Sequence, residues 1–367
     1  MGVCDVAIAG AGIVGAACAA ECAAAGLKVV VIEAGVIGGG ATAAGMGHLV
    51  VMDDSPAQLT LTAYSCRLWS ELAARLPAEI EYTACGTIWV AADEEEMAEV
   101  RRKKSVYDSI GARAEILGAN ELAEAEPNLR RGLAGGLLVA DDAVVYPPCA
   151  ARYFLECARA QGAIVQNGWA IGFTREGIRL EDGSFLPAGF TIDATGAWAR
   201  GVPGLEVRKR KGHLAITDRY PRFVRHQLVE LGYLKSAHST TEDSVAFNVQ
   251  PRKTGQVLIG SSRQYGAEHA AIDEPILRRM LQRAIEYMPR LAERSAIRTW
   301  TGFRAATADK LPLLGPSPDN DRHYLAIGHE GLGIATSLAT AKLVADQILR
   351  RVSAIPIEPY LPTRDHA

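Results

Sequence analysis

The residues with the clearest chemical potential are three glycines near the start of the chain. Gly10, Gly12 and Gly15 are spaced as G-x-G-x-x-G, between an apolar segment, residues 5–9, and an alanine-rich segment, residues 14–25. In this context Gly10 permits a tight turn, Gly12 leaves room for a pyrophosphate against backbone N–H groups at a helix N-terminus, and Gly15 permits close packing of the helix on a strand. The spacing therefore predicts a dinucleotide-binding turn.

An acidic residue at the expected distance strengthens this prediction. Glu33 ends a second apolar segment, residues 28–33, roughly 20 positions after the glycine motif, as the dinucleotide fingerprint requires. A carboxylate there can accept hydrogen bonds from the ribose hydroxyls of a dinucleotide. A glycine motif by itself also serves purely structural turns, but the motif, its expected strand and helix, and Glu33 together favour a cofactor site.

Two further glycine-rich segments favour FAD over NAD. Residues 38–47 are almost all small, and their backbone could lie against a large planar ring system; a flexible linker is the alternative. Residues 328–333 (GHEGLG) lie between an expected strand and the last expected helix. The N-terminus of that helix would stabilise the negative charge that develops on a reduced flavin.

These motifs require a particular set of elements around them. The first 33 residues predict strand, helix and strand, with the two strands paired in parallel and buried on both faces. Strand-like stretches between residues 212 and 263 predict an antiparallel sheet. We therefore expect an α/β fold with a Rossmann-type FAD-binding domain (residues 1–84, 146–210 and 302–367) and a discontinuous, mainly antiparallel substrate domain (residues 85–145 and 211–301).

Composition limits the classes of partner. The chain has 367 residues, with 39 Lys and Arg against 42 Asp and Glu, which gives no broad electrostatic reason to expect nucleic acid or an anionic membrane. No segment combines the length and apolarity of a membrane span. Seven cysteines without a CxxC pair indicate reduced thiols. We expect a cytoplasmic protein that acts on a small molecule and holds no metal; a metal pair at Cys18 and Cys22 is less favoured than simple helix packing.

Together the motifs resemble the D-amino acid oxidase family of flavoproteins, which includes glycine oxidase and sarcosine oxidase. The matching segments extend over the whole chain: residues 5–33, 42–47, 194–198 (ATGAW), 251–255 (PRKTG), 301–304, 309–315 and 328–333. Within that family, residues 46–54 and 146–148 are most similar to the FAD subunit of bacterial D-hydroxyproline dehydrogenase and to the related opine oxidases.

The resemblance implies noncovalently bound FAD and a set of residues that hold it. These are Gly10, Gly12, Ile13, Val14, Gly15, Glu33, Ala34, Thr42, Ala43, Ala44, Gly45, Met46, Gly47, Thr195, Gly196, Trp198, Gly302, Arg304, His329, Glu330, Gly331, Leu332 and Gly333. Arg304 would also lie over the flavin and bind the substrate carboxylate, for which a planar guanidinium is well suited because it can donate two parallel hydrogen bonds. An internal salt bridge of Arg304 is the alternative. Ala305 departs from the proline that many relatives carry, which affects the expected loop geometry.

Other parts of the substrate pocket have weaker signals. Tyr233 could hydrogen-bond the substrate, or it could be a core residue of a strand. His48 could contact the flavin or a substrate hydroxyl, or it could be a hydrogen-bonded loop histidine. The basic run Arg208–Lys211 predicts a solvated turn or strand edge; a partner or a second phosphate-bearing cofactor is the alternative.

The resemblance implies oxidation of a small D-amino or imino acid, with cis-4-hydroxy-D-proline favoured and a pyrroline carboxylate as product. Hydride transfer from Cα to flavin N5 needs positioning more than an acid–base pair. Electrons would then pass to an acceptor other than free oxygen, through accessory electron-transfer subunits. The alternatives are a glycine- or sarcosine-type oxidase that produces hydrogen peroxide, and a non-catalytic FAD-binding subunit of a larger complex.

Overall fold

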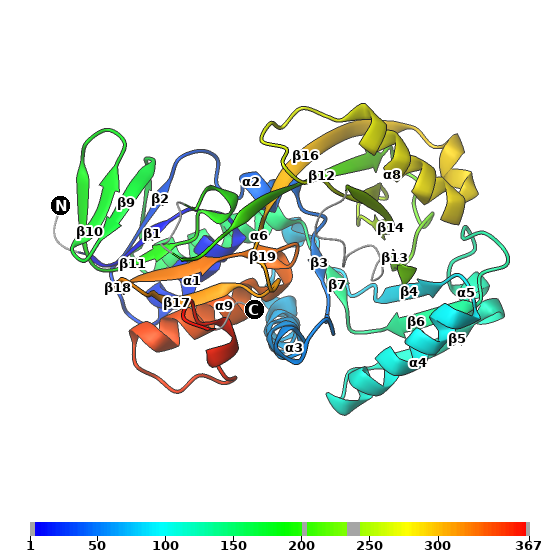
Figure 1. Ribbon diagram of the computed structural model, residues 1–367, viewed down its shortest axis with the longest axis horizontal. Coiled ribbons are helices and arrows are strands. Elements are labelled where there is room, and N and C mark those ends of the chain that lie inside the picture. The colour runs from blue at the N-terminus through cyan, green and yellow to red at the C-terminus, as the bar shows by residue number, and fades with distance from the viewer. Residues whose placement is uncertain (1–3, 200–203, 233–242, 365–367) are drawn as a thin grey trace.

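The computed structural model describes residues 4–199, 204–232 and 243–364. Its elements form two large sheets that lie side by side, each with its own helices (Figure 1). Two long strands, β12 (Arg208–Thr217) and β16 (Ala296–Ala306), extend from one half of the molecule to the other. The predicted α/β fold with one parallel and one mainly antiparallel sheet is confirmed.

The parallel sheet has the strand order β17-β18-β11-β1-β2-β8. Its strands are β1 (Cys4–Ala9), β2 (Val29–Glu33), β8 (Ile164–Asn167), β11 (Phe185–Asp193), β18 (Asn320–Ile327) and β17 (Leu313–Ser317). All neighbours pair in parallel except β17 and β18. The hairpin β9 (Ala170–Thr174) and β10 (Gly177–Leu180) extends from β11.

The two faces of this sheet bury alternate residues of β1, as the period of a strand requires. Val6 and Ile8 pack in the core formed with the helices α1 (Ile13–Ala24), α6 (Pro147–Ala160) and α9 (Gly333–Ile348). Ala7 and Ala9 pack on the other face, in a core that includes residues of the β10 hairpin strand. The continuous apolar run of β1 is therefore explained by burial on both sides.

The second sheet has nine strands in the order β19-β16-β12-β15-β14-β13-β4-β6-β5. Besides β12 and β16 they are β4 (Thr87–Ala91), β5 (Ala114–Gly118), β6 (Gly135–Val139), β13 (Gln227–Glu230), β14 (Ser244–Pro251), β15 (Val257–Arg263) and β19 (His329–Glu330). All neighbours pair antiparallel except β4 and β13. Helix α8 (Glu274–Tyr287) packs on β14 and β15, and α4 (Glu94–Ser109) packs on β4, β5 and β6.

The remaining elements are a 17-residue helix and several short segments. The small-residue segment after Glu33 contains the helix α2 (Gly40–Ala44) and leads into β3 (His48–Leu49), which pairs with β7 (Ala143–Val144). Helix α3 (Pro56–Leu72) follows and contacts α9, and α5 (Ala119–Ala125) precedes β6. The turns η1 (Ala73–Arg75), η2 (Ala78–Ile80), η3 (Gly196–Trp198), η4 (Pro289–Glu293) and η5 (Glu358–Tyr360) complete the described elements.

The basic run is not a solvated turn, so this prediction was wrong for half of its residues. Arg208 and Lys209 reach the surface, but Arg210 is buried and Lys211 is fully buried. All four belong to β12 and pair with β16, and the burial of the last two side chains comes from the groups that they contact. Lys211 Nζ donates to the carbonyl oxygen of Ala271, and Arg210 pairs with Glu330.

Two of the expected domain boundaries fall within strands of the nine-stranded sheet. The boundary at 210/211 falls inside β12, and the boundary at 301/302 falls inside β16. The two strands pair with each other from Arg208↔Ala306 to Thr217↔Ala296. Both strands therefore continue through the expected division, which stays a prediction.

Candidate functional site

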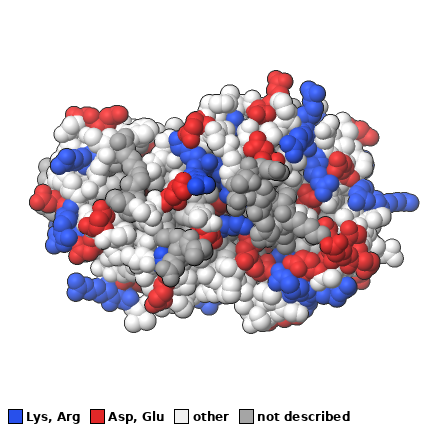
Figure 2. All heavy atoms as spheres, viewed as in Figure 1, with Lys and Arg blue, Asp and Glu red and all other residues white. Residues whose placement is uncertain are grey.

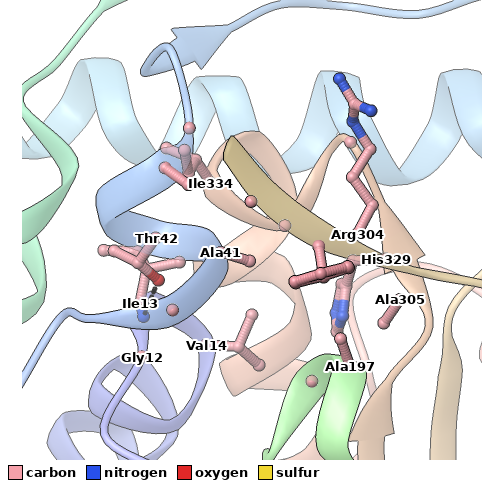
Figure 3. A pocket seen from close by; sticks show the side chains of 18 of the residues that line it. Gly12, Ile13, Val14, Ala41, Thr42, Ala197, Arg304, Ala305, His329 and Ile334 are labelled. Carbon is pink, nitrogen blue, oxygen red and sulfur yellow. Dashed lines mark hydrogen bonds between the residues drawn. The ribbon is translucent and has the colours of Figure 1, made fainter. Parts of the chain in front are cut away.

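One pocket of about 540 Å³ lies where the two sheets meet, within the size range of ligand and cofactor sites. It is lined by the glycine turn after β1, the segment that contains α2, the turn after β11, the strands β12 and β16, and the start of α9. Residues far apart in the sequence thus meet at one cavity, and they include most of the residues predicted to hold a cofactor. Figure 3 shows part of this lining.

The glycine turn forms one end of the pocket. Gly10 has φ of 101°, and a Cβ atom there would come within 2.5 Å of the carbonyl oxygen of Ala194. Gly12 is the N-cap of α1, and Ile13, the first residue of that helix, donates its backbone N–H to Thr42 Oγ1 at 3.0 Å. Figure 3 shows Thr42 lying over this helix start. The positive end of a 12-residue helix therefore opens on the pocket beside small residues, as a pyrophosphate requires.

Glu33 lies at the end of β2 and lines the same end of the pocket. One carboxylate oxygen accepts the N–H of Ala11 at 2.6 Å, and the other accepts the N–H of Gly35 at 2.8 Å. Each oxygen retains a lone pair for a ligand hydroxyl. The backbone thus holds the carboxylate where the fingerprint predicts a ribose.

A second helix N-terminus opens on the pocket from the far end of the chain. Gly333 and Ile334 begin α9 and line the cavity, together with the preceding residues from Gly328 to Leu332. His329 is buried, its Nε2 lies 2.9 Å from Thr340 Oγ1, and burial lowers its pKa to about 4. The imidazole is therefore neutral at pH 7 and adds no charge of its own to the positive end of the helix.

The residues present fit FAD. Two helix N-termini, a ribose-type carboxylate and a series of glycines line one continuous cavity. Two of the glycines let the walls of the cavity pack closely on each other: a Cβ on Gly302 would lie 2.2 Å from the Ala44 side chain, and a Cβ on Gly45 would lie 2.7 Å from Ile334. A cofactor of two phosphates and two ring systems needs this combination of positive helix ends and thin backbone walls.

Arg304 lies on β16 and lines the pocket. Its Nη1 donates to the carbonyl oxygen of Ser262 at 3.0 Å. The guanidinium packs over Gly212 of β12, where a Cβ would come within 2.6 Å of Nη1. In Figure 3 its side chain extends away from Gly12, Val14 and His329. The turn of residues 10–15 together with Glu33 is called the glycine cradle below, and Arg304 can present donors to an anionic ligand outside it.

A single carboxylate, Glu330, lies among three arginines. Arg210 Nη1 contacts it at 2.8 Å and Arg263 Nε at 3.8 Å. Burial alone would raise the pKa of the Glu330 carboxyl, but the charges of Arg263, Arg304 and Arg210 outweigh burial and lower the pKa to about 2. Glu330 is therefore ionised. Its single negative charge lies among three positive charges, so this part of the pocket wall has a net positive charge.

A buried histidine supports the position of Arg304 indirectly. The N–H of Asp273 donates to His213 Nε2 at 3.0 Å, so the proton of the neutral ring lies on Nδ1, which is 3.0 Å from Ser262 Oγ. Ser262 Oγ also accepts the backbone N–H of His213 at 2.9 Å. Burial, with Lys211 nearby, lowers the pKa of His213. The side chain of Ser262 is thus held by two donors while its carbonyl oxygen accepts from Arg304.

His48 lines the pocket as expected, but its role stays a prediction. Burial lowers its pKa to about 4, while a hydrogen bond with Gln250 acts in the opposite direction. Its Nε2 is buried and has no hydrogen-bond partner within the described ranges. A neutral imidazole with one open nitrogen can accept or donate a hydrogen bond to a ligand.

Three predicted cofactor residues do not line the pocket: Gly15, Ala43 and Gly47. Gly15 packs instead against the residue that follows β1, because a Cβ there would lie 2.0 Å from the carbonyl oxygen of Gly10. Gly47 packs equally closely on the backbone of Val145. Tyr233 lies outside the described residues.

Sequence reasoning missed a second wall of the pocket. Its members are Thr87, Trp89, Gly212, Leu214, Val229, Asn248, Ser261 and Arg263, all on strands of the nine-stranded sheet. Along their strands these residues alternate with residues that point to the opposite face of the sheet. Such alternation shows that a strand has two faces, but it does not show that one of them lines a pocket. Sequence alone could not place them at a pocket.

The surface and the helices limit other site types. Lys and Arg side chains lie interspersed with Asp and Glu over the face shown in Figure 2. No helix in residues 4–199, 204–232 and 243–364 is long and apolar enough to cross a membrane. The same ranges contain no group of three or more His, Cys, Asp or Glu residues arranged to hold a metal ion. Cys18 and Cys22 are buried in the helical core beside the parallel sheet.

Comparison with known proteins matches these features to a family. Residues 5–347 match the family model described as FAD dependent oxidoreductase (DAO). The chain is 28% identical to glycine oxidase of Geobacillus kaustophilus, over 98% of this chain and 97% of that protein. It is 26% identical to hydrogen cyanide synthase subunit HcnC of Pseudomonas aeruginosa, over 98% of this chain and 96% of that protein. The crystal structure of the Geobacillus kaustophilus glycine oxidase superposes with a TM-score of 0.88 at 27% identity, over 100% of both chains.

Proposed function

The chain belongs to the DAO family of FAD dependent oxidoreductases, and we propose that it oxidises a small amino or imino acid at the pocket between its two sheets. FAD is its cofactor, and the family resemblance implies that the cofactor is held noncovalently. The proposed substrate class follows from the residues that line the pocket beyond the glycine cradle and from the activities named for the relatives.

The observation that carries this proposal is the position of Arg304. Its guanidinium is outside the glycine cradle, on the same pocket, and packs over Gly212, which has no side chain to cover it. Glu330 pairs closely with Arg210. A carboxylate ligand is the natural partner of an arginine in such a site, because two parallel charge-assisted hydrogen bonds fix both its position and its orientation.

The chemistry expected of the protein is mainly positioning. When bound, FAD supplies the two-electron acceptor that oxidation of a C–N single bond to C=N requires. Arg304 would hold the carboxylate and so fix the adjacent Cα, and Ser262 with His213 would hold Arg304. Apolar residues such as Leu214 and Val50 would exclude water from the reacting carbon. The amine must be neutral, and its proton leaves to solvent as the imine forms.

We favour cis-4-hydroxy-D-proline as the substrate, with a pyrroline carboxylate as the product. Support comes from residues 46–54, which resemble the corresponding part of D-hydroxyproline dehydrogenase. Five alternate members of this segment line the pocket: Met46, His48, Val50, Met52 and Asp54. The segment that carries the finer resemblance is therefore also a wall of the site. Accessory electron-transfer subunits belong to this proposal, as does a cytoplasmic location.

Two other functions remain candidates for the same site. Identity to glycine oxidase over the full length of both chains favours a glycine- or sarcosine-type oxidase that produces hydrogen peroxide. A relative named as a subunit of hydrogen cyanide synthase favours a chain that works within a complex, or a non-catalytic FAD-binding subunit.

The test is an anaerobic absorbance titration of the purified flavoprotein against cis-4-hydroxy-D-proline, D-proline, glycine, sarcosine and an opine, followed by admission of air. We expect the D-imino acids to bleach the flavin and the colour to return slowly in air. Bleaching by glycine or sarcosine with fast recovery and peroxide would establish the oxidase instead. A yellow protein that no amino or imino acid bleaches would contradict both enzymatic functions.

A further inference from the structure

Part of the pocket wall is a row of side chains on three neighbouring strands. Trp89 of β4 is in register with Val229 of β13, which is in register with Asn248 of β14. Residues directly opposite each other in a sheet point to the same face, and all three line the pocket. They are 2%, 6% and 8% exposed, respectively. The row is therefore a firmly packed wall.

Asn248 is the member of this row with a carboxamide. Its Oδ1 is buried, and no residue of the described part of the chain donates a hydrogen bond to it. A buried carbonyl oxygen without a donor costs stability, and native proteins keep few of them. This loss of stability is expected at a binding site, where the ligand donates the missing hydrogen bond, because functional sites often contain groups that are satisfied only in the complex.

Apolar side chains cover the position next to Asn248 in the sheet. The next residue in the row is Gly260 of β15, which pairs with Asn248. A Cβ on Gly260 would come within 2.8 Å of Leu214 Cδ2 and 3.0 Å of Met46 Sδ. These two side chains therefore cover, with apolar surface, the glycine that pairs with Asn248. In such a place a ligand hydroxyl has little water to compete with, so the amide can discriminate strongly between ligands with and without it.

Asn248 and Arg304 are suited to opposite ends of one small molecule. The guanidinium of Arg304 packs over Gly212 of β12, and β12, β15 and β14 are consecutive in the sheet. Arg304 itself belongs to β16, but its guanidinium lies over β12, which is two strand spacings, roughly 10 Å, from the strand of Asn248. The side chains of Asn248 and Arg304 both line the same pocket.

We propose that Asn248 is a specificity residue that accepts a hydrogen bond from a hydroxyl group on the ring or side chain of the substrate, while Arg304 holds the carboxylate. This inference rests on the proposed oxidation of a small amino or imino acid, and it narrows the substrate class to hydroxylated members. Substrates without a polar group at that position leave the amide oxygen unpaired in the complex.

The test compares Asn248→Leu with the wild-type protein on cis-4-hydroxy-D-proline and D-proline. For the wild type we expect a higher kcat/KM on the hydroxylated compound, and for Asn248→Leu a fall of about fivefold or more in the ratio of the two values, which corresponds to one hydrogen bond. Val229→Ala is the matched control: it alters the same wall without a polar atom and should change both values by a similar factor. Melting temperature supplies a second readout, because replacing an unpaired amide oxygen by an apolar side chain should leave Tm unchanged or raise it.

Each other outcome overturns a defined part of the inference. An unchanged ratio in Asn248→Leu, with both compounds still oxidised, would overturn the subsite and leave the proposed function intact. A wild type that prefers D-proline or glycine would do the same. A lowered Tm with equal losses on both compounds would show that Asn248 is only structural. If the wild type oxidises none of the compounds, the proposed function fails, and the subsite fails with it.

Discussion

Replacing Arg304 by alanine is expected to remove most of the recognition of a substrate carboxylate while leaving the fold intact and FAD held by the other residues of its site. Arg304 Nη1 donates to the carbonyl oxygen of Ser262, a bond whose loss should cost about 0.5–1.5 kcal/mol of stability. Glu330 would keep Arg210 at 2.8 Å and Arg263 at 3.8 Å, so its carboxylate would not be left without a cation. We therefore expect a folded, yellow variant.

The effect on the substrate should be much larger than the effect on stability. Truncating one member of a desolvated, hydrogen-bonded charge pair costs about 2–5 kcal/mol of binding. At about 1.4 kcal/mol for each factor of ten, this corresponds to roughly 30- to 4,000-fold in kcat/KM. Arg304→Lys keeps the charge but loses the planar fork, so its loss should be intermediate.

The assay is anaerobic flavin reduction over a range of substrate concentrations, with the apparent dissociation constant taken from the same titration. Arg298→Ala is the matched control, because Arg298 lies on the same strand, β16, with an exposed side chain over the ring of Trp300 at 5.3 Å. That variant should behave as the wild type. An Arg304→Ala protein that binds substrate unchanged would refute the assignment of the carboxylate site, and an equal loss in Arg298→Ala would point to a general effect on the sheet.

Two further changes test the surroundings of the site. Gly212→Ala should weaken substrate binding much as Arg304→Ala does, because the new Cβ would come within 2.6 Å of the end of the Arg304 side chain and displace it. Tm should change little, since that side chain is flexible. Normal kinetics in this variant would show that Arg304 does not need the space over Gly212. Burial raises the pKa of the Asp142 carboxyl to about 7, so the folded protein keeps a proton that the unfolded chain releases near pH 4. The free energy of unfolding should therefore fall as the pH rises from about 4 to about 7. Asp142→Asn should remove this part of the pH dependence, which denaturant titrations at several pH values would measure. An identical pH dependence in the variant would contradict the raised pKa of Asp142.

The glycine cradle could be predicted from the sequence because its requirements are local. Gly10 needs a positive φ, Gly12 begins a helix and Glu33 ends the next strand, and each of these properties depends on residues that are close along the chain. The same is true of the turn from Gly328 to Gly333, whose helix start follows directly. Local backbone geometry, rather than distant contacts, carries these signals.

The burial of Arg210 and Lys211 could not be predicted in the same way. Four consecutive basic residues are usually solvated, and nothing in their immediate neighbours along the chain shows that Arg210 and Lys211 are buried. The partners that make burial possible, Glu330 and the carbonyl oxygen of Ala271, lie 120 and 60 residues away. Such pairs form only when the chain has folded.

By itself the sequence determined the fold class and the cofactor class, because helix starts, tight turns and strand ends are encoded by short runs of residues. Only the tertiary structure decided how the substrate wall is built. Asn248, Gly212 and Arg304 lie on three strands that are separated along the chain and share one face only through the strand order and register of the sheet. Register depends on the packing of the whole sheet, so an alternating pattern in one strand cannot reveal which side chains will stand opposite it.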